Sequence, residues 1–222
     1  MSFLILLPDR NVKRFDWSGA FLPEAKAFAK RHACLPEEIV RVDISKRRAM
    51  MREAVCSAIE SHEPRTVVFF CHGWRTGIQL GFDLKTVDEL AEAIHNVNAG
   101  VGCDPVIILF ACSTGKGSEI DVDKDKEAPG GDGGFADELR DALCRAGNID
   151  NRVIAHSTAG HTTMNPFVRI FTGDFSPTGG HGGSWIVRPG SERWAKWRAK
   201  LKTPFRFDFP TMSVGQIHEA LG

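Results

Sequence analysis

Two apolar segments, each followed directly by a reactive residue, decide the fold: Thr66-Val-Val-Phe-Phe-Cys-His-Gly73 and Pro105-Val-Ile-Ile-Leu-Phe-Ala-Cys112. Continuous runs of β-branched, aliphatic and aromatic residues are typical of parallel strands that helices cover on both faces. Both runs have the length of a strand and are shorter than an ordinary helix. The sequence therefore predicts two central strands that end at His72 and Cys112.

Outward from these segments, short apolar runs alternate with helical patterns. Further strands are expected at 3–7, 39–44, 152–156, 167–171 and 184–187, and helices at 24–31, 46–60, 86–98 and 135–145. Strands that alternate with amphipathic helices indicate a sheet with helices packed on both faces. We therefore expect an α/β fold of three layers, with a mostly parallel sheet of about six strands.

The length of 222 residues fits a single domain that spans the whole chain, 1–222. Within it, residues 115–134 are rich in glycine and acidic side chains and almost free of apolar ones, which predicts a flexible acidic loop. Residues 203–222 show no clear periodicity and are expected to form a C-terminal extension.

Composition excludes several classes of protein. Lys and Arg number 28, as do Asp and Glu, so the net charge is zero and binding to nucleic acid or to an anionic membrane through bulk charge is not expected. No apolar run reaches the ~18 residues of a membrane span, and the N-terminal stretch lacks the basic region of a signal peptide. The six cysteines form no Cys-x-x-Cys pair, which favours reduced thiols in the cytoplasm over a disulfide framework or a metal site.

The candidate chemistry lies where the two central strands end. Ligands of open α/β sheets bind at the carboxyl ends of strands, so His72 and Cys112 are expected at one edge if their strands are neighbours. A histidine beside a cysteine can take the thiol proton and so produce the nucleophilic thiolate. Gly73 has no Cβ, which allows its backbone N–H to approach a developing oxyanion. Cys71 points to the opposite face by strand alternation and is expected to pack in the core.

This layout resembles the caspase-like cysteine peptidases, the group that contains caspases, metacaspases and CHAT domains. The family pattern is an apolar strand followed by His-Gly, here His72-Gly73, and a later apolar strand followed by the catalytic cysteine, here Ala111-Cys112. The order of strands and helices from residue 3 to about 156 also agrees with the family. Gly183-Ser184-Trp185 is similar to a Gly-Ser that precedes the last strand in these enzymes.

The resemblance implies a cysteine endopeptidase, a thiol hydrolase that acts on a protein or peptide substrate and needs no cofactor. In this interpretation Cys112 attacks the scissile carbonyl, His72 moves the proton, and the backbone N–H groups of Gly73 and Cys112 form the oxyanion hole. Further substrate contacts are expected from the loop after the first strand and from residues after the strand 152–156. The candidates are Asp9, Arg10, Asp16, His156, His161 and Asn165.

Two alternatives remain open from the sequence. In an α/β-hydrolase, Ser113 of the segment Ala111-Cys-Ser-Thr-Gly115 would be the nucleophile of a serine esterase, on a turn that runs straight into a helix. The second alternative is a caspase-like scaffold without catalysis that serves as an interaction module.

Overall fold

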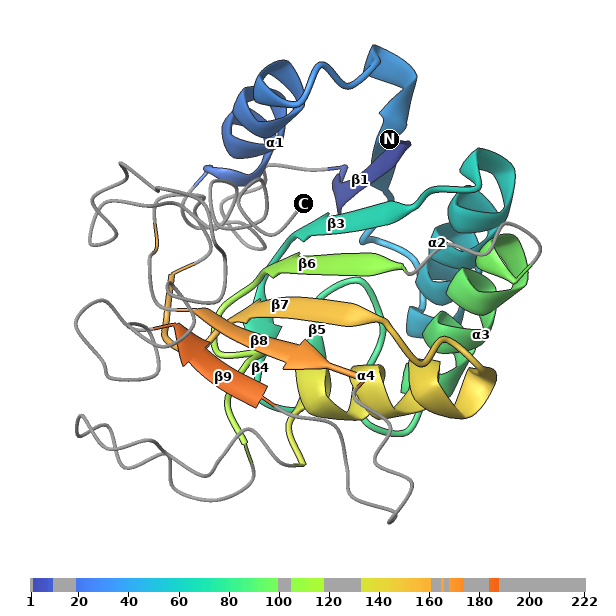
Figure 1. The fold of residues 1–222 in the computed structure, drawn as a ribbon. Helices are drawn as coiled ribbons and strands as arrows, with labels where there is room; N and C mark the ends of the chain where they lie inside the picture. Colours follow the sequence, from blue (N-terminus) through green and yellow to red (C-terminus); the bar gives the residue numbers. More distant parts are fainter. Residues whose placement is uncertain are drawn as a thin grey trace, which may run out of the picture.

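The computed structural model describes residues 2–9, 19–99, 105–117, 133–160, 165, 168–173 and 184–187. It contains a mostly parallel sheet with helices on both faces, which confirms the predicted three-layer α/β fold (Figure 1). The sheet has seven strands, where about six were expected.

The strand order is β2-β1-β3-β6-β7-β8-β9. The strands are β1 Phe3–Pro8, β2 Ile39–Val42, β3 Thr66–Phe70, β6 Val106–Phe110, β7 Arg152–His156, β8 Val168–Thr172 and β9 Ser184–Val187. The first five are mutually parallel, whereas β8 and β9 are antiparallel to their neighbours. The central position of β3 and β6 agrees with their continuous apolar sequence, because both faces of each strand are buried.

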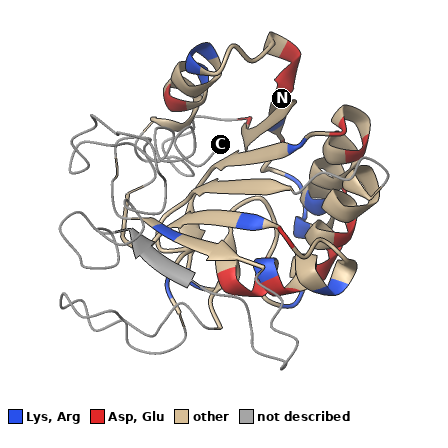
Figure 2. Ribbon diagram, in the orientation of Figure 1, with Lys and Arg blue, Asp and Glu red and all other residues tan. Residues whose placement is uncertain are grey.

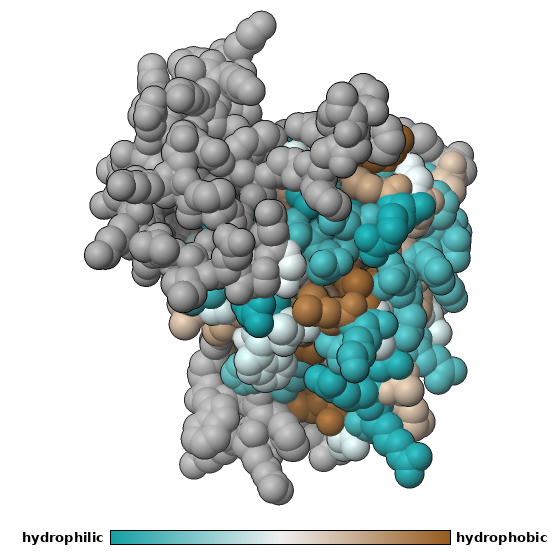
Figure 3. All heavy atoms as spheres, turned by 90° about the horizontal axis from the view of Figure 1, so that it is seen from below, coloured by the Kyte–Doolittle hydropathy of each residue, from teal (hydrophilic) through white to brown (hydrophobic). Residues whose placement is uncertain are grey.

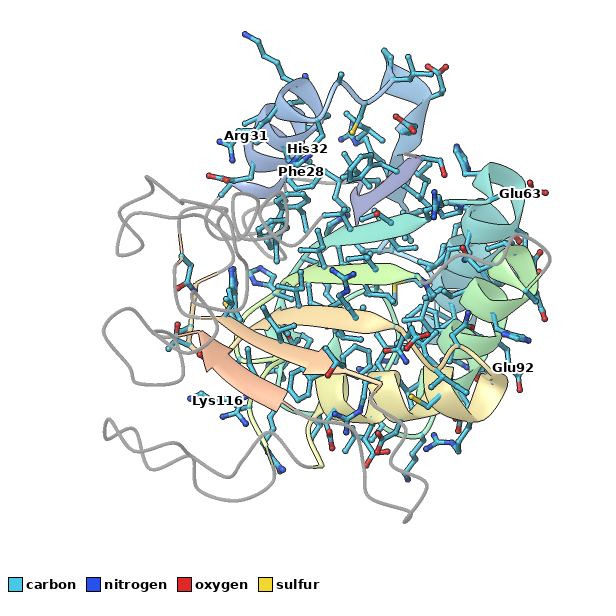
Figure 4. The ribbon with its side chains drawn as sticks, in the orientation of Figure 1. Phe28, Arg31, His32, Glu63, Glu92 and Lys116 are labelled. Atoms are coloured by element: carbon cyan, nitrogen blue, oxygen red, sulfur yellow. The ribbon has the colours of Figure 1, made fainter. Side chains whose placement is uncertain are left out.

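The two faces of the sheet are covered unequally. Helix α1 (Phe21–Arg31) covers one face, while α2 (Arg48–His62), α3 (Val87–Asn98) and α4 (Phe135–Ala146) belong to the core of the other. Figure 4 shows Phe28 of α1 directed toward the sheet, where its ring meets Phe70 and Phe110 at centroid distances of 6.0 and 5.7 Å. Among the described residues, the charged ones lie mainly on the helices and loops, and few lie on the strands (Figure 2).

Strand alternation divides the core into two clusters. Phe70 and Phe110 belong to the cluster under α1, whereas Cys71 and Ala111 belong to the cluster under the three other helices. The predicted burial of Cys71 on the opposite face is therefore confirmed. By the same alternation the next residues, His72 and Cys112, return to the α1 face.

Sequence periodicity missed two short elements. A hairpin of β4 (Gly73–Trp74) and β5 (Gly77–Ile78) follows β3 directly, and a 3-10 helix (Pro36–Glu38) precedes β2. Two-residue strands are too short to show an alternating pattern. Most of the predicted acidic loop, 118–132, and the C-terminal extension, 203–222, lie outside the described residues.

None of the helices within the described ranges combines the length and the hydropathy that crossing a membrane requires. Where Figure 3 shows described residues, this face is mainly hydrophilic, with hydrophobic patches between the polar side chains.

Candidate functional site

The carboxyl ends of three neighbouring strands bring His72, Cys112 and His156 to one edge of the sheet. Phe70 of β3 pairs with Phe110 of β6. His72 and Cys112 each follow two residues later, so they are at equivalent positions along the two parallel strands. Cys71 N donates to Phe110 O at 3.4 Å, which carries the pairing past the strand ends. Because neighbouring strands lie about 4.8 Å apart, the two residues that the sequence selected are adjacent.

Backbone and aromatic contacts hold His72. Its imidazole meets the Phe21 ring of α1 edge-on, with ring centroids 5.0 Å apart. Its backbone N–H donates to Gln79 Oε1 at 3.2 Å, and its carbonyl accepts from Gln79 N at 2.9 Å. The β4–β5 hairpin and α1 therefore fix a half-buried imidazole at the end of β3.

Gly73 is in very close contact with the end of β6. A Cβ at this position would lie 2.7 Å from Ala111 Cβ, 2.8 Å from Thr114 Cγ2 and 3.0 Å from Cys112 O. Any larger residue would push the two strand ends apart. This packing is a second reason for glycine after His72, beside the predicted oxyanion contact, and that contact remains a prediction.

The segment after β7 reaches across to Cys112. Gly160 N donates to Cys112 Sγ at 3.2 Å, Ser113 N donates to Thr158 O at 3.0 Å, and Gly115 N donates to His156 O at 2.8 Å. The first of these contacts places a backbone donor directly on the sulfur. The half-buried Cys112 thiol therefore lies between the end of β3 and the loop after β7.

Two of the predicted substrate residues have structural contacts instead. His156 is fully buried, and its ring packs edge-on against Phe110 with centroids 5.8 Å apart. Asp9 turns toward β2: its N–H donates to Val42 O at 2.8 Å, and its carboxylate accepts from Ile44 N at 3.3 Å. Their substrate role remains a prediction.

Asn165 lies close to the thiol loop. Its side-chain amide donates to Gly160 O at 2.9 Å and to Thr158 Oγ1 at 3.3 Å. The sequence selected Asn165 as a substrate contact, whereas Gly160 and Thr158 were missed, because an isolated Gly in a Ser-Thr-Ala-Gly loop carries no functional signal. Arg10, Asp16 and His161 lie outside the described residues.

The other described cysteines are poor nucleophiles. Burial raises the pKa of Cys71 to about 12 and those of Cys34 and Cys56 to about 11, with nearby glutamates adding to the effect at Cys34 and Cys56. Burial also raises the pKa of Cys144. Thiolate is the reactive form, so at neutral pH these four thiols react slowly.

Metal ligation has no support in the part of the chain that the structure describes. There, no group of three or more His, Cys, Asp and Glu side chains is arranged to hold a metal ion.

Lys116 is the charged side chain nearest in sequence to Cys112, and it lies on the carboxyl-end side of the sheet (Figure 4).

The comparisons with known proteins give only remote matches. No protein-family model and no curated protein matches the chain. Among solved structures, it is similar to the Bordetella bronchiseptica enzyme WbmH in complex with NAD+, with 12% identity over 71% of this chain and 56% of that one, and a TM-score of 0.31. WbmG of the same organism, in complex with NAD and UDP, has 10% identity over 68% of this chain and 51% of its own, and a TM-score of 0.27. The chain thus spans little more than half of either enzyme.

These findings correct the predicted identity. The caspase-like recognition and the assignment as a thiol protease or other hydrolase are contradicted: no family model or curated protein matches, and the two solved structures named above are NAD complexes, not caspase-like peptidases.

The two alternatives fare no better. A nucleophile elbow passes straight from strand to helix, but the described residues that follow Ser113, 114–117, form no helix. Ser113 N is also occupied by its bond to Thr158 O. A non-catalytic caspase-like module falls with the caspase-like recognition, because it depends on the same resemblance.

NAD itself does not fit the residues at the first strand of this chain. A dinucleotide-binding fold carries a glycine-rich turn directly after its first strand, where the pyrophosphate meets the backbone. After β1, residues 9–18 contain no glycine. We therefore assign no step to NAD.

Proposed function

We propose that the chain is a thiol-dependent enzyme that forms a covalent adduct between Cys112 and a small carbonyl compound. The observation that carries the proposal is that His72 and Cys112 follow the ends of two paired parallel strands, and that the Gly160 N–H is directed at the thiol. A small ligand is proposed because the Cys112 thiol is half-buried, with the end of β3 beside it and the Gly160 N–H directed at the sulfur.

The proposed step is an addition. His72 accepts the thiol proton, the Cys112 sulfur forms a bond to the carbonyl carbon, and the π electrons of the carbonyl move to its oxygen. That oxygen then takes the proton from the His72 imidazolium, which gives a hemithioacetal with nothing oxidised or reduced. The Gly73 and Cys112 backbone N–H groups are the proposed donors to the oxygen while it carries charge.

The chemistry requires a reduced thiol. The cysteines that the structure describes are all free, which supports the proposal that the protein acts in a reducing compartment such as the cytoplasm.

The experiment uses [1-13C]propanal as the probe and NMR detection of the hemithioacetal carbon. We expect an adduct with the wild-type protein, its loss in Cys112→Ser, and its retention in the matched control Cys56→Ser. In His72→Gln we expect adduct formation to slow by about 100-fold, the low end of general-base effects. An adduct that persists in Cys112→Ser, or no adduct with the wild type, would overturn the proposal.

A further inference from the structure

The loop after β7 contains a short chain of hydrogen bonds that ends on the proposed nucleophile. Asn165 Nδ2 donates to Gly160 O at 2.9 Å, and Gly160 N donates to Cys112 Sγ at 3.2 Å. The same Asn165 amide donates to Thr158 Oγ1 at 3.3 Å, and Thr158 O accepts from Ser113 N at 3.0 Å. One side chain is therefore bonded to both points at which this loop meets Cys112 and Ser113.

The backbone at Gly160 requires this arrangement. Gly160 has φ = 127°, a region that residues with a Cβ rarely adopt. A Cβ there would lie 2.9 Å from Asn165 Nδ2, so the side-chain amide occupies the space that a larger residue would need. Glycine at 160 and asparagine at 165 together aim one backbone N–H at the sulfur.

We propose that Asn165 is a positioning residue: it holds Gly160 so that its N–H stabilises the Cys112 thiolate. This inference deepens the proposed function and rests on it. The sequence suggested Asn165 as a substrate contact, whereas its hydrogen bonds hold the loop whose Gly160 N–H contacts the Cys112 thiol. By sharing its amide between two points of the loop, Asn165 restrains Gly160 in the conformation that donates.

Other titratable groups surround Cys112 and affect the same measurement. Within the described ranges they are His72 at the end of β3, His156 at the end of β7, Cys71 on the opposite face and Lys116 on the turn that follows. None of them is changed by a substitution at position 165, so a difference between variants reports on the hydrogen-bond chain.

The test is the pH–rate profile of Cys112 alkylation by iodoacetamide, followed by peptide mass spectrometry in wild type, Asn165→Leu and Asn165→Ala. Leucine is close to asparagine in size, has no N–H donors and adds no charge near the thiol. We expect both variants to move the midpoint of the profile upward by about one pH unit, so that the rate on its rising limb falls about tenfold.

Asn98 provides the matched control. Its side-chain amide also makes two bonds, to Ile94 O at 2.8 Å and Pro64 O at 3.3 Å, at the opposite end of β3. Asn98→Ala should leave the midpoint unchanged. An equal shift in Asn98→Ala, or an unchanged midpoint in Asn165→Leu, would overturn the inference. The wild-type propanal adduct, and with it the proposed function, would still stand.

A second measurement needs no variant at position 165 and so does not depend on its folding. In the 15N-labelled wild type, the Gly160 amide proton should move downfield as Cys112 ionises, and Cys112→Ser should abolish this movement. A Gly160 resonance that does not respond to Cys112 would contradict the hydrogen bond itself.

Discussion

Replacing Gly73 by alanine tests the close packing of the two strand ends. The added methyl would lie 2.7 Å from Ala111 Cβ and 2.8 Å from Thr114 Cγ2, well inside the 3.5–4.0 Å of ordinary carbon contacts. Overpacking of this kind costs about 1–3 kcal/mol. Alanine regains about 0.4–1 kcal/mol by restricting the unfolded chain, so we expect Gly73→Ala to lower the free energy of unfolding by about 1–2 kcal/mol.

A double-mutant cycle with Thr114→Ser isolates the cause. Serine removes Cγ2 but keeps the hydroxyl that donates to Ala111 O at 3.0 Å. In the double variant one of the two shortest contacts is gone, so part of the loss should be recovered as a coupling of about 0.5–1 kcal/mol. Urea denaturation followed by circular dichroism measures all four proteins. Strict additivity, or a Gly73→Ala protein as stable as the wild type, would refute the close approach of β3 and β6.

Two further predictions concern buried groups other than His72 and Cys112. Burial raises the pKa of Cys71 from 9.0 to about 12 in the folded protein, so the unfolded chain loses this proton first as pH rises. The resulting contribution to stability is present in full below pH 9 and is lost between pH 9 and about 12. In urea titrations at rising pH, the free energy of unfolding should therefore fall more steeply in wild type than in Cys71→Ala. Parallel curves for the two proteins would contradict this prediction. Arg140 is 1% exposed and pairs with the buried Asp137, so Arg140→Ala should cost about 3–5 kcal/mol by removing the positive partner of a buried carboxylate. Arg145→Ala is the control, because its pair with Asp88 is exposed and should be worth less than about 1 kcal/mol; equal losses in the two variants would disprove the role of burial.

The sequence predicted the strands and helices that bury continuous or periodic apolar faces. Strand β7 and the start of α4 were placed at their observed residues, and β3 and β6 within one residue at each end. These elements could be predicted because the residues that each one buries form a continuous or periodic apolar pattern in the sequence. The hairpin at Gly73–Trp74 and Gly77–Ile78 leaves none, since its four residues are fixed by pairing and by contacts with β6.

The site was predictable only in part, because only some of its residues follow a local apolar pattern. His72 and Cys112 follow strongly apolar strands, and the parallel rule brings such ends together. The contact from Gly160 to Cys112 depends on how a loop returns over the sheet, and no local pattern encodes it. The family resemblance was wrong because it depended on two dipeptides at strand ends, a placement that many α/β folds share.

The strand order has a consequence for how the chain emerges from the ribosome. From β1 onward, strands β3, β6, β7, β8 and β9 add to the same side of the sheet in the order of synthesis. Each newly made strand therefore finds its template already assembled, and each growing edge is exposed only until the next strand is translated. Pauses in translation between β6 and β7 should be the most hazardous, because the apolar edge of β6 would then be uncovered in the nascent chain.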